Sequence, residues 1–283
     1  MQTTFVHVAD TRIAVHSSEG RGPALVLVHG NSASARAFDR QLNGPLGRAL
    51  RVVAIDLPGH GQSEDAADPQ AVYSLPGFAS VLEQLAGALE LRRAVFAGWS
   101  LGGHIVLEAA PRLREAAGFC IFGTPPLAWP PAMDQAFLPD PSAPILFQEH
   151  YTEDEVRLRA EGMVAPGAPV PAWLPEDIRR SDGRFRAMLA ASLGSVGLGD
   201  EVVITRELRQ PLAVLHGAHD RVVNAGYIAA LTLPTLWRGA LQTLPQAGHM
   251  PQWEDSASFD ALLQAFVEDC AKPTRARAPT SPD

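Results

Sequence analysis

The sequence predicts an α/β fold in which helices flank a mostly parallel central sheet and a helical cap is inserted. Short continuous apolar runs alternate with segments of helical periodicity, which is typical of parallel strands buried on both faces. These runs are Ala24–Val28, Val52–Ile55, Ala94–Ala97, Phe119–Phe122 and Leu212–Leu215. The alternation implies strands joined by helical crossovers within one sheet.

Further elements complete this pattern at both ends of the chain. Thr4–Val8 and Arg12–His16 predict an antiparallel hairpin, and Leu241–Leu244 predicts the last strand. Two apolar stripes at helical spacing predict amphipathic helices. The first stripe is Phe78, Val81, Leu82, Leu85 and Leu89, and the second is Phe259, Leu262, Leu263, Phe266 and Val267.

The stretch 124–205 interrupts the alternation and is rich in proline. Its helical patterns are short and cover Glu153–Glu161, Pro175–Arg180 and Arg184–Leu193. Scattered tryptophan, tyrosine and phenylalanine residues argue against a disordered linker, because such linkers are poor in aromatic residues. We therefore expect a folded cap here.

The predicted domain organisation follows from these segments. Residues 1–123 and 206–272 form the core, 124–205 the cap and 273–283 a disordered tail that begins after Lys272. An apolar content of 46% in 283 residues suits a globular protein with a large core. We find no internal repeat.

Charge and cysteine content exclude several classes of protein. The formal net charge is -8, so we expect no nucleic-acid partner, because phosphate binding needs a basic surface. The two cysteines, Cys120 and Cys270, lie far apart in the sequence, so we expect no disulfide framework. Cys120 lies in an apolar run, which predicts that it is a small buried hydrophobic residue. No signal-peptide pattern or membrane-length apolar run occurs, so we expect a cytoplasmic enzyme without a membrane partner. The oligomeric state stays open.

The strongest chemical signal is the segment 98–103, Gly-Trp-Ser-Leu-Gly-Gly, between an apolar strand and a helical stripe. Strand, sharp turn and helix are the context in which a serine nucleophile is presented above a sheet. The glycines flanking such a turn leave room for a strained backbone. Ser100 is therefore the predicted nucleophile, and a glycine-rich turn without catalytic function is the alternative.

A serine nucleophile needs a base and an acid that orients the base. His249 follows the last predicted strand, and Asp220 follows the strand Leu212–Leu215. The chain order Ser, Asp, His and the positions after strand ends match a catalytic triad of this type. The remaining histidines are expected to be structural or to line a pocket.

The developing oxyanion needs preorganised donors. One predicted donor is the backbone N–H of Leu101, directly after the nucleophile. The other is the N–H of Asn31, in the loop after an early strand. A loop residue that bonds its own backbone is the alternative for Asn31.

Metal and nucleotide cofactors are not expected. The nearest approach to a metal cluster, His216-Gly-Ala-His219-Asp220, lacks the spacing of a two-metal site. No GxGxxG or other phosphate-binding loop occurs. The predicted reaction therefore uses no cofactor.

These segments together resemble the α/β-hydrolase superfamily over nearly the whole chain. Within it, the chain is similar to the metal-independent N-acyl-homoserine lactonases of this fold. The resemblance is carried by His29-Gly-Asn-Ser-Ala-Ser34, Asp56-Leu-Pro-Gly-His-Gly-Gln-Ser63, Gly98-Trp-Ser-Leu-Gly-Gly-His-Ile105, Gly123-Thr-Pro-Pro126 and Ala247-Gly-His249. It implies a quorum-quenching lactonase that opens N-acyl-homoserine lactones through an acyl-enzyme.

The resemblance also implies substrate contacts. Trp99 and Tyr151 are the predicted contacts to a small ester or lactone substrate, with core packing as the other interpretation of Trp99. The alternatives for function are a general carboxylesterase, a perhydrolase or carbon–carbon hydrolase, and a ligand receptor that retains the pocket. Lactone turnover compared with aryl-ester turnover separates the lactonase from the carboxylesterase, and stoichiometric product formation indicates the receptor.

Overall fold

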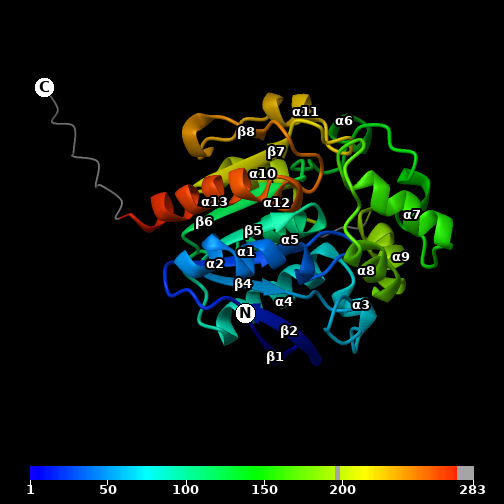
Figure 1. Cartoon of the computed structure of the whole chain (residues 1–283), viewed down its shortest axis with the longest axis horizontal. Helices are drawn as coiled ribbons and strands as arrows, with labels where there is room; N and C mark the ends of the chain where they lie inside the picture. Colours follow the sequence, from blue (N-terminus) through cyan, green and yellow to red (C-terminus); the bar gives the residue numbers. More distant parts are fainter. Residues whose placement is uncertain (195–197, 273–283) are drawn as a thin grey trace, which may run out of the picture.

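The computed structural model describes residues 1–194 and 198–272. Its centre is an eight-stranded sheet with the spatial order β1-β2-β4-β3-β5-β6-β7-β8 (Figure 1). The strands are β1 (Gln2–Val8), β2 (Thr11–Ser17), β3 (Ala24–Val28), β4 (Arg51–Ile55), β5 (Val95–Trp99), β6 (Gly118–Phe122), β7 (Leu212–Gly217) and β8 (Gln242–Leu244). Every strand predicted from the sequence is present.

The direction of the strands confirms the predicted sheet. The hairpin of β1 and β2 is antiparallel and turns between Val8 and Thr11, and β2 also pairs antiparallel with β4. All pairs from β4 to β8 are parallel. The chain order reverses at β3, which lies between β4 and β5, so the loops after β3 and β5 meet at the carboxyl edge, where such sheets place their sites.

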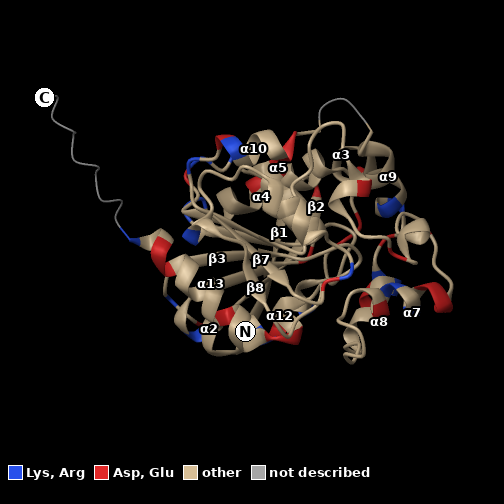
Figure 2. Cartoon of the chain, turned by 90° about the horizontal axis from the view of Figure 1, so that it is seen from above, with Lys and Arg blue, Asp and Glu red and all other residues tan. Residues whose placement is uncertain are grey.

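Helices cover both faces of the sheet (Figure 2). One face carries α4 (Leu75–Ala88) and α5 (Leu101–Ala109), and the other carries α2 (Pro45–Ala49) and α13 (Ser256–Ala271). The two predicted stripes lie on α4 and α13, and they bury their apolar side chains in two separate clusters, one on each face. Shorter elements of the core are η1 (Ala35–Phe38), α1 (Asp39–Asn43), α3 (Pro69–Val72), α11 (Ala225–Ala230), η3 (Trp237–Gly239) and α12 (Pro251–Glu254).

The segment between β6 and β7 is helical. It contains α6 (Met133–Ala136), η2 (Ala143–Ile145), α7 (Glu153–Gly162), α8 (Trp173–Arg180), α9 (Arg184–Ser192) and α10 (Glu201–Glu207). The helices α7, α8 and α9 match the three predicted ones within about two residues, whereas the sequence analysis missed α6, η2 and α10. The helix α10 packs against α5, so it lies with the core layer (Figure 2).

Hydrogen bonds join this insertion to loops at the carboxyl ends of the strands. The Ser34 hydroxyl after β3 donates to Asp177 of α8 at 2.5 Å. The N–H of Ala165, after α7, donates to Glu254 of α12 at 2.6 Å. The insertion therefore lies over the edge of the sheet at which the predicted site residues gather.

Two further predictions can be compared with the structure. Cys120 is a free, fully buried cysteine in β6, which confirms the prediction of a small buried hydrophobe. The predicted disordered tail, 273–283, lies outside the described residues. None of the helices within 1–194 and 198–272 is long and apolar enough to cross a membrane.

Candidate active site

Ser100 lies in the sharp turn between β5 and α5. Its backbone has φ 52° and ψ -118°, a region that residues with a side chain rarely adopt. The flanking glycines permit the turn, because an added Cβ at Gly98 would lie 2.2 Å from Gly102 O. The Ser100 N–H donates to Phe122 O at 2.9 Å, which fixes the turn against β6. The turn presents a half-buried serine at the carboxyl edge of the sheet.

His249 and Asp220 meet although they come from different loops. His249 Nδ1 lies 2.9 Å from Asp220 Oδ2, and both side chains are buried. The other carboxylate oxygen of Asp220 accepts the backbone N–H groups of Val222 at 2.7 Å and Val223 at 3.1 Å. Three hydrogen bonds therefore fix the carboxylate of Asp220 beside the imidazole.

The electrostatics of this pair favour an ionised acid. Burial opposes ionisation of Asp220, but the charge and hydrogen bond of His249 and the Val222 N–H together hold the pKa of Asp220 below its usual value. An ionised carboxylate only accepts hydrogen bonds, so the proton of a neutral His249 belongs on Nδ1. Nε2 is then free to act as a base.

His249 contacts residues that adjoin Ser100 in the sequence and across the sheet. The indole N–H of Trp99 donates to His249 O at 2.7 Å, and the two ring centroids are 5.9 Å apart. An added Cβ at Gly123 would lie 2.9 Å from His249 Cε1, and Gly123 follows the Phe122 carbonyl that binds the Ser100 N–H. The structure thus brings all three predicted triad residues to one edge of the sheet.

The other candidate histidines have different surroundings. His219 is exposed, whereas His216 is buried with Nδ1 4.0 Å from Asp220 Oδ2. Burial lowers the pKa of His216, which favours its neutral form. His104 bonds both carboxylate oxygens of Glu201 at 2.9 Å. Of these three, only His216 has a ring nitrogen within 4.0 Å of the Asp220 carboxylate, and that distance is longer than the 2.9 Å of His249.

Asp56 directly follows β4, and its contacts are those of a loop residue. Its carboxylate accepts the N–H of Ala35 at 2.7 Å and the N–H of Gln62 at 2.8 Å. His16 Nε2 lies 3.1 Å from the same carboxylate. Asp56 therefore shapes the loops after β3 and β4.

The two predicted oxyanion donors lie on adjoining loops. Leu101 is the first residue of α5, so its N–H has no acceptor within the helix. Asn31 is buried in the loop after β3, the strand next to β5. An added Cβ at Gly30 would lie 3.2 Å from Ser100 Cβ, which shows how closely this loop approaches the nucleophile.

The two predicted substrate contacts have other partners in the structure. Trp99 has no exposed surface, and its indole holds the His249 carbonyl, which gives it a packing and positioning role. Tyr151 is half-buried beneath the Arg186 guanidinium, at 4.2 Å from the ring centroid, and its hydroxyl donates to Leu146 O. Substrate contact by Trp99 and Tyr151 stays a prediction.

The sequence analysis missed Glu254, which holds the loop of His249. Glu254 Oε2 accepts the N–H of Gly248 at 2.9 Å and the N–H of Met250 at 3.1 Å. Its other oxygen accepts the Ala165 N–H from the insertion. The available signal was an acidic residue in the first turn of a helix just after His249, a position that an N-terminal helix dipole favours.

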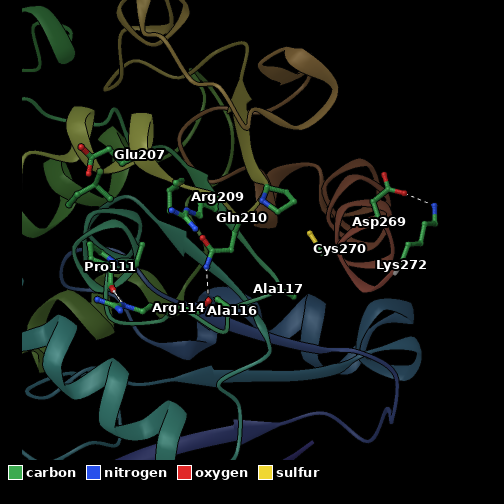
Figure 3. A pocket seen from close by; sticks show the side chains of 14 residues that line it. Pro111, Arg114, Ala116, Ala117, Glu207, Arg209, Gln210, Asp269, Cys270 and Lys272 are labelled. Atoms are coloured by element: carbon green, nitrogen blue, oxygen red, sulfur yellow. Dashed lines mark hydrogen bonds and ion pairs between the residues drawn. The ribbon is translucent and has the colours of Figure 1, made fainter. Parts of the chain in front are cut away.

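A surface groove of about 1020 Å³ lies away from these residues (Figure 3). Its lining includes Ala116 and Ala117 before β6 and Pro211 before β7, so it lies at the amino ends of the strands. Ser100, Asp220 and His249 lie at the carboxyl ends and do not line it. The groove is therefore separate from the candidate site. Within the described part of the chain, no group of three or more His, Cys, Asp or Glu residues is arranged to hold a metal ion.

Comparison with solved structures gives a close match. The N-acyl homoserine lactonase AidH, solved in complex with N-butanoyl homoserine, is 37% identical and superposes with a TM-score of 0.92. The match covers 96% of this chain and 98% of that chain. A putative aryl esterase from Burkholderia cenocepacia, with 21% identity and a TM-score of 0.79, shares the fold.

Sequence comparison gives esterases and a family. A pimeloyl-[acyl-carrier protein] methyl ester esterase of Nitrosomonas europaea is 29% identical over 260 residues, which cover 87% of this chain and 96% of that protein. The corresponding esterase of Xylella fastidiosa is 28% identical over 265 residues, or 88% and 96% of the two proteins. These relatives indicate hydrolysis of an ester or lactone bond. Because the model of the alpha/beta hydrolase family matches residues 25–262, which include Ser100, Asp220 and His249, the chain belongs to that family.

Proposed function

We propose that this enzyme opens the lactone ring of N-acyl homoserine lactones, which is the activity of a quorum-quenching lactonase. The observation that carries the proposal is the likeness to the lactonase AidH, at 37% identity over 96% of the chain. The methyl ester esterases are 29% identical or less over a smaller share of the chain. Ser100, His249 and Asp220 are the proposed catalytic triad.

Ring opening begins with attack by the Ser100 hydroxyl on the lactone carbonyl carbon, while His249 Nε2 takes the hydroxyl proton. The tetrahedral oxyanion rests on the N–H groups of Asn31 and Leu101, and losing one such donor typically costs about 3–4 kcal/mol of transition-state stabilisation. The ring C–O bond then breaks, and His249 returns the proton to the ring oxygen. The resulting hydroxyl stays attached to the acyl group on Ser100.

Deacylation completes the cycle with one water molecule. His249 removes a proton from this water, which attacks the ester carbonyl on Ser100. Collapse of the second tetrahedral intermediate releases N-acyl homoserine and returns the proton to Ser100. The ionised Asp220 stabilises the imidazolium in both steps, because its carboxylate faces Nδ1 at 2.9 Å.

The arrangement of exposure supports this chemistry. Ser100 is half-buried, whereas Asp220 and His249 are 8% and 4% exposed. A substrate therefore reaches the nucleophile while the acid and base stay shielded from water, which strengthens their electrostatic interaction. We place the N-acyl chain beneath the cap, where Tyr151 is the proposed contact.

A second candidate function is a carboxylesterase for small open-chain esters. The methyl ester esterases of Nitrosomonas and Xylella favour it, because this chain covers 96% of each of them. The same residues cleave either bond. The alcohol diffuses away from an open-chain ester, whereas the hydroxyl released from a lactone stays attached to the acyl-enzyme.

Matched substrates distinguish the two functions. We would compare kcat/KM for N-hexanoyl homoserine lactone with that for methyl N-hexanoyl-2-aminobutanoate, which has the same amide and an open-chain ester. We expect the lactone to react at least about tenfold faster and Ser100→Ala to abolish turnover. Turnover of the methyl ester alone would overturn the lactonase proposal.

Two controls complete this experiment. Mass spectrometry of the products with and without a chelator tests the metal-free mechanism, for which we expect equal rates. The amount of product per protein molecule tests the receptor alternative. Many equivalents of N-acyl homoserine support the enzyme, and a single equivalent indicates a ligand receptor.

A further inference from the structure

Arg186 of α9 is a buried arginine that connects the cap to the loop after β3. It is 3% exposed, and its guanidinium donates to four neutral oxygens. Three of these belong to the insertion: Gln148 O at 2.7 Å, Glu149 O at 2.6 Å and Ser181 Oγ at 2.8 Å. The fourth is Ser32 Oγ in the core, at 3.1 Å.

The charge of Arg186 has no close counterion. Among the described residues, no carboxylate oxygen lies within 4.0 Å of its guanidinium, in contrast to Arg184, which pairs with Asp182 at 2.7 Å. A buried cation without an ion pair is costly, and an apolar side chain would often stabilise the fold as well or better. The guanidinium nevertheless stays protonated, because its pKa is far above neutrality. Such a residue calls for a role beyond stability.

The contact of Arg186 in the core is a strained serine. Ser32 has φ 56°, and it lies in a turn closed by the Ala33 N–H donating to Gly30 O at 3.3 Å. Serine rarely adopts a positive φ, so neighbouring contacts have to hold it there. The contact with Arg186 is one of them.

Two hydrogen bonds in series join Arg186 to Asn31 through Ser32. A guanidinium only donates, so Ser32 Oγ accepts from Arg186 and keeps its single proton for another partner. That proton is donated to Asn31 Oδ1 at 2.7 Å. The chain Arg186, Ser32, Asn31 therefore runs in one direction and fixes both central residues of the turn.

We propose that Arg186 is a positioning residue of the cap, which orients the turn carrying Asn31 and thereby sets the geometry of the oxyanion hole. This inference rests on the role assigned to Asn31 in the proposed function. It does not depend on the identity of the acyl substrate, since every ester or lactone substrate forms an oxyanion at the same place. Placement of the cap and stabilisation of the transition state are thus connected through one side chain.

The test uses hydrolysis of 4-nitrophenyl acetate by full-length Arg186→Met, Arg186→Lys and Ser32→Ala. An aryl ester is chosen because a failure of lactone turnover then leaves this experiment intact. We expect kcat to fall about 10- to 100-fold in Arg186→Met, with KM changed by less than about threefold, because removal of an oxyanion donor costs about 100- to 1000-fold and a displaced donor costs less. Arg186→Lys keeps the positive charge but loses the planar guanidinium with its several donors. Its kcat should therefore lie between those of the wild type and Arg186→Met.

The matched control is Arg179→Gln, which removes another cap arginine and its exposed ion pair with Glu153. Its kcat should stay within twofold of the wild-type value. A loss in Arg186→Met no larger than in this control, or a loss confined to KM, would overturn the proposal. Ser32→Ala carries the test if Arg186→Met does not fold, and a kcat within twofold of wild type in that variant contradicts the proposal equally.

Two further measurements separate positioning from general destabilisation. In the double variant Ser32→Ala, Arg186→Met, we expect a loss no greater than in Arg186→Met alone, because both changes break one chain of hydrogen bonds. Losses that multiply would show that Arg186 acts independently of Ser32. Affinity for a trifluoromethyl ketone, which forms an oxyanion on a serine nucleophile, should fall by the same factor as kcat, and unchanged affinity contradicts the proposal.

Discussion

Glu254 accepts the backbone N–H groups on both sides of His249, from Gly248 at 2.9 Å and from Met250 at 3.1 Å. His249 is therefore held in three ways: Glu254 binds the backbone on either side of it, Trp99 binds its carbonyl, and Asp220 binds Nδ1 of its ring. Glu254 also binds the Ala165 N–H of the insertion. The cap and the loop of the proposed base consequently share one carboxylate.

Replacing Glu254 by alanine should loosen the loop of His249. We expect kcat to fall about tenfold and the free energy of unfolding to fall by about 1–3 kcal/mol, because three N–H groups lose their acceptor. Steady-state kinetics and denaturant unfolding measure the two effects. Glu268→Ala removes an exposed carboxylate of α13 and serves as the control. Equal kcat values in the two variants would show that Glu254 does not position His249.

Asp220→Asn tests the acid of the proposed triad. The amide can donate to Nδ1, which favours the wrong tautomer of His249, so kcat should fall roughly 10³- to 10⁴-fold with the fold intact. Circular dichroism checks the fold and ester turnover measures kcat. Asp220→Glu, which keeps a carboxylate, should retain more activity than the amide variant. A kcat of Asp220→Asn within tenfold of wild type would assign the acid elsewhere.

Trp99→Phe tests whether the indole positions the base. The change removes one hydrogen bond to His249 O but keeps a buried aromatic ring. We expect a loss of about 1 kcal/mol of transition-state stabilisation, which is about fivefold in kcat. Trp237→Phe is a matched control, since its indole N–H binds Asp269 far from the site. If both variants keep full activity, the contact of Trp99 has a packing role only.

Asp177 makes stability depend on pH. It is 4% exposed in α8, and burial raises its pKa to about 6 against the opposing bond from Ser34. A carboxyl group whose pKa is higher in the folded than in the unfolded protein stabilises the fold below the ordinary value near 3.8, and that contribution is lost as pH rises through about 6.

The neutral isostere Asp177→Asn should therefore raise the free energy of unfolding at pH 8 by about 3 kcal/mol, with little effect at pH 4. Denaturant unfolding at pH 4, 6 and 8 measures this difference. Asp134→Asn changes an exposed residue of the same insertion and should show no such trend. An Asp177→Asn protein less stable than wild type at pH 8 would mean that the ion pair with Arg36 outweighs the cost of burial.

Local signals in the sequence were enough for the strands, the amphipathic helices and the turn at Ser100. Apolar runs and helical stripes reflect the burial of each element separately, so they can be recognised without knowing which elements pack together. The turn at Ser100 was recognisable because its glycines stand at fixed spacing around the serine, and the close approach of Gly98 to Gly102 lies within the turn itself. Ser100, Asp220 and His249 each follow a parallel strand, which placed all three at one edge of the sheet, since parallel strands share a carboxyl end.

Other features depended on segments distant in the chain. The sequence predicted a substrate contact for Trp99, and the tertiary structure gave its indole a hydrogen-bond partner in His249, 150 positions away. The helix α10 was missed because its stability comes from packing on α5 and not from its own pattern.

The sequence by itself thus determined the α/β sheet and the types of residue available for ester chemistry, because these follow from short-range periodicity and turn geometry. Only the tertiary structure decided which side chains hold those residues in place. Arg186 and Ser32 are 154 positions apart, and no local pattern marks their contact. Their contact depends on the packing of the cap on the core. Buried donors need acceptors, and the fold decides which acceptors lie within reach.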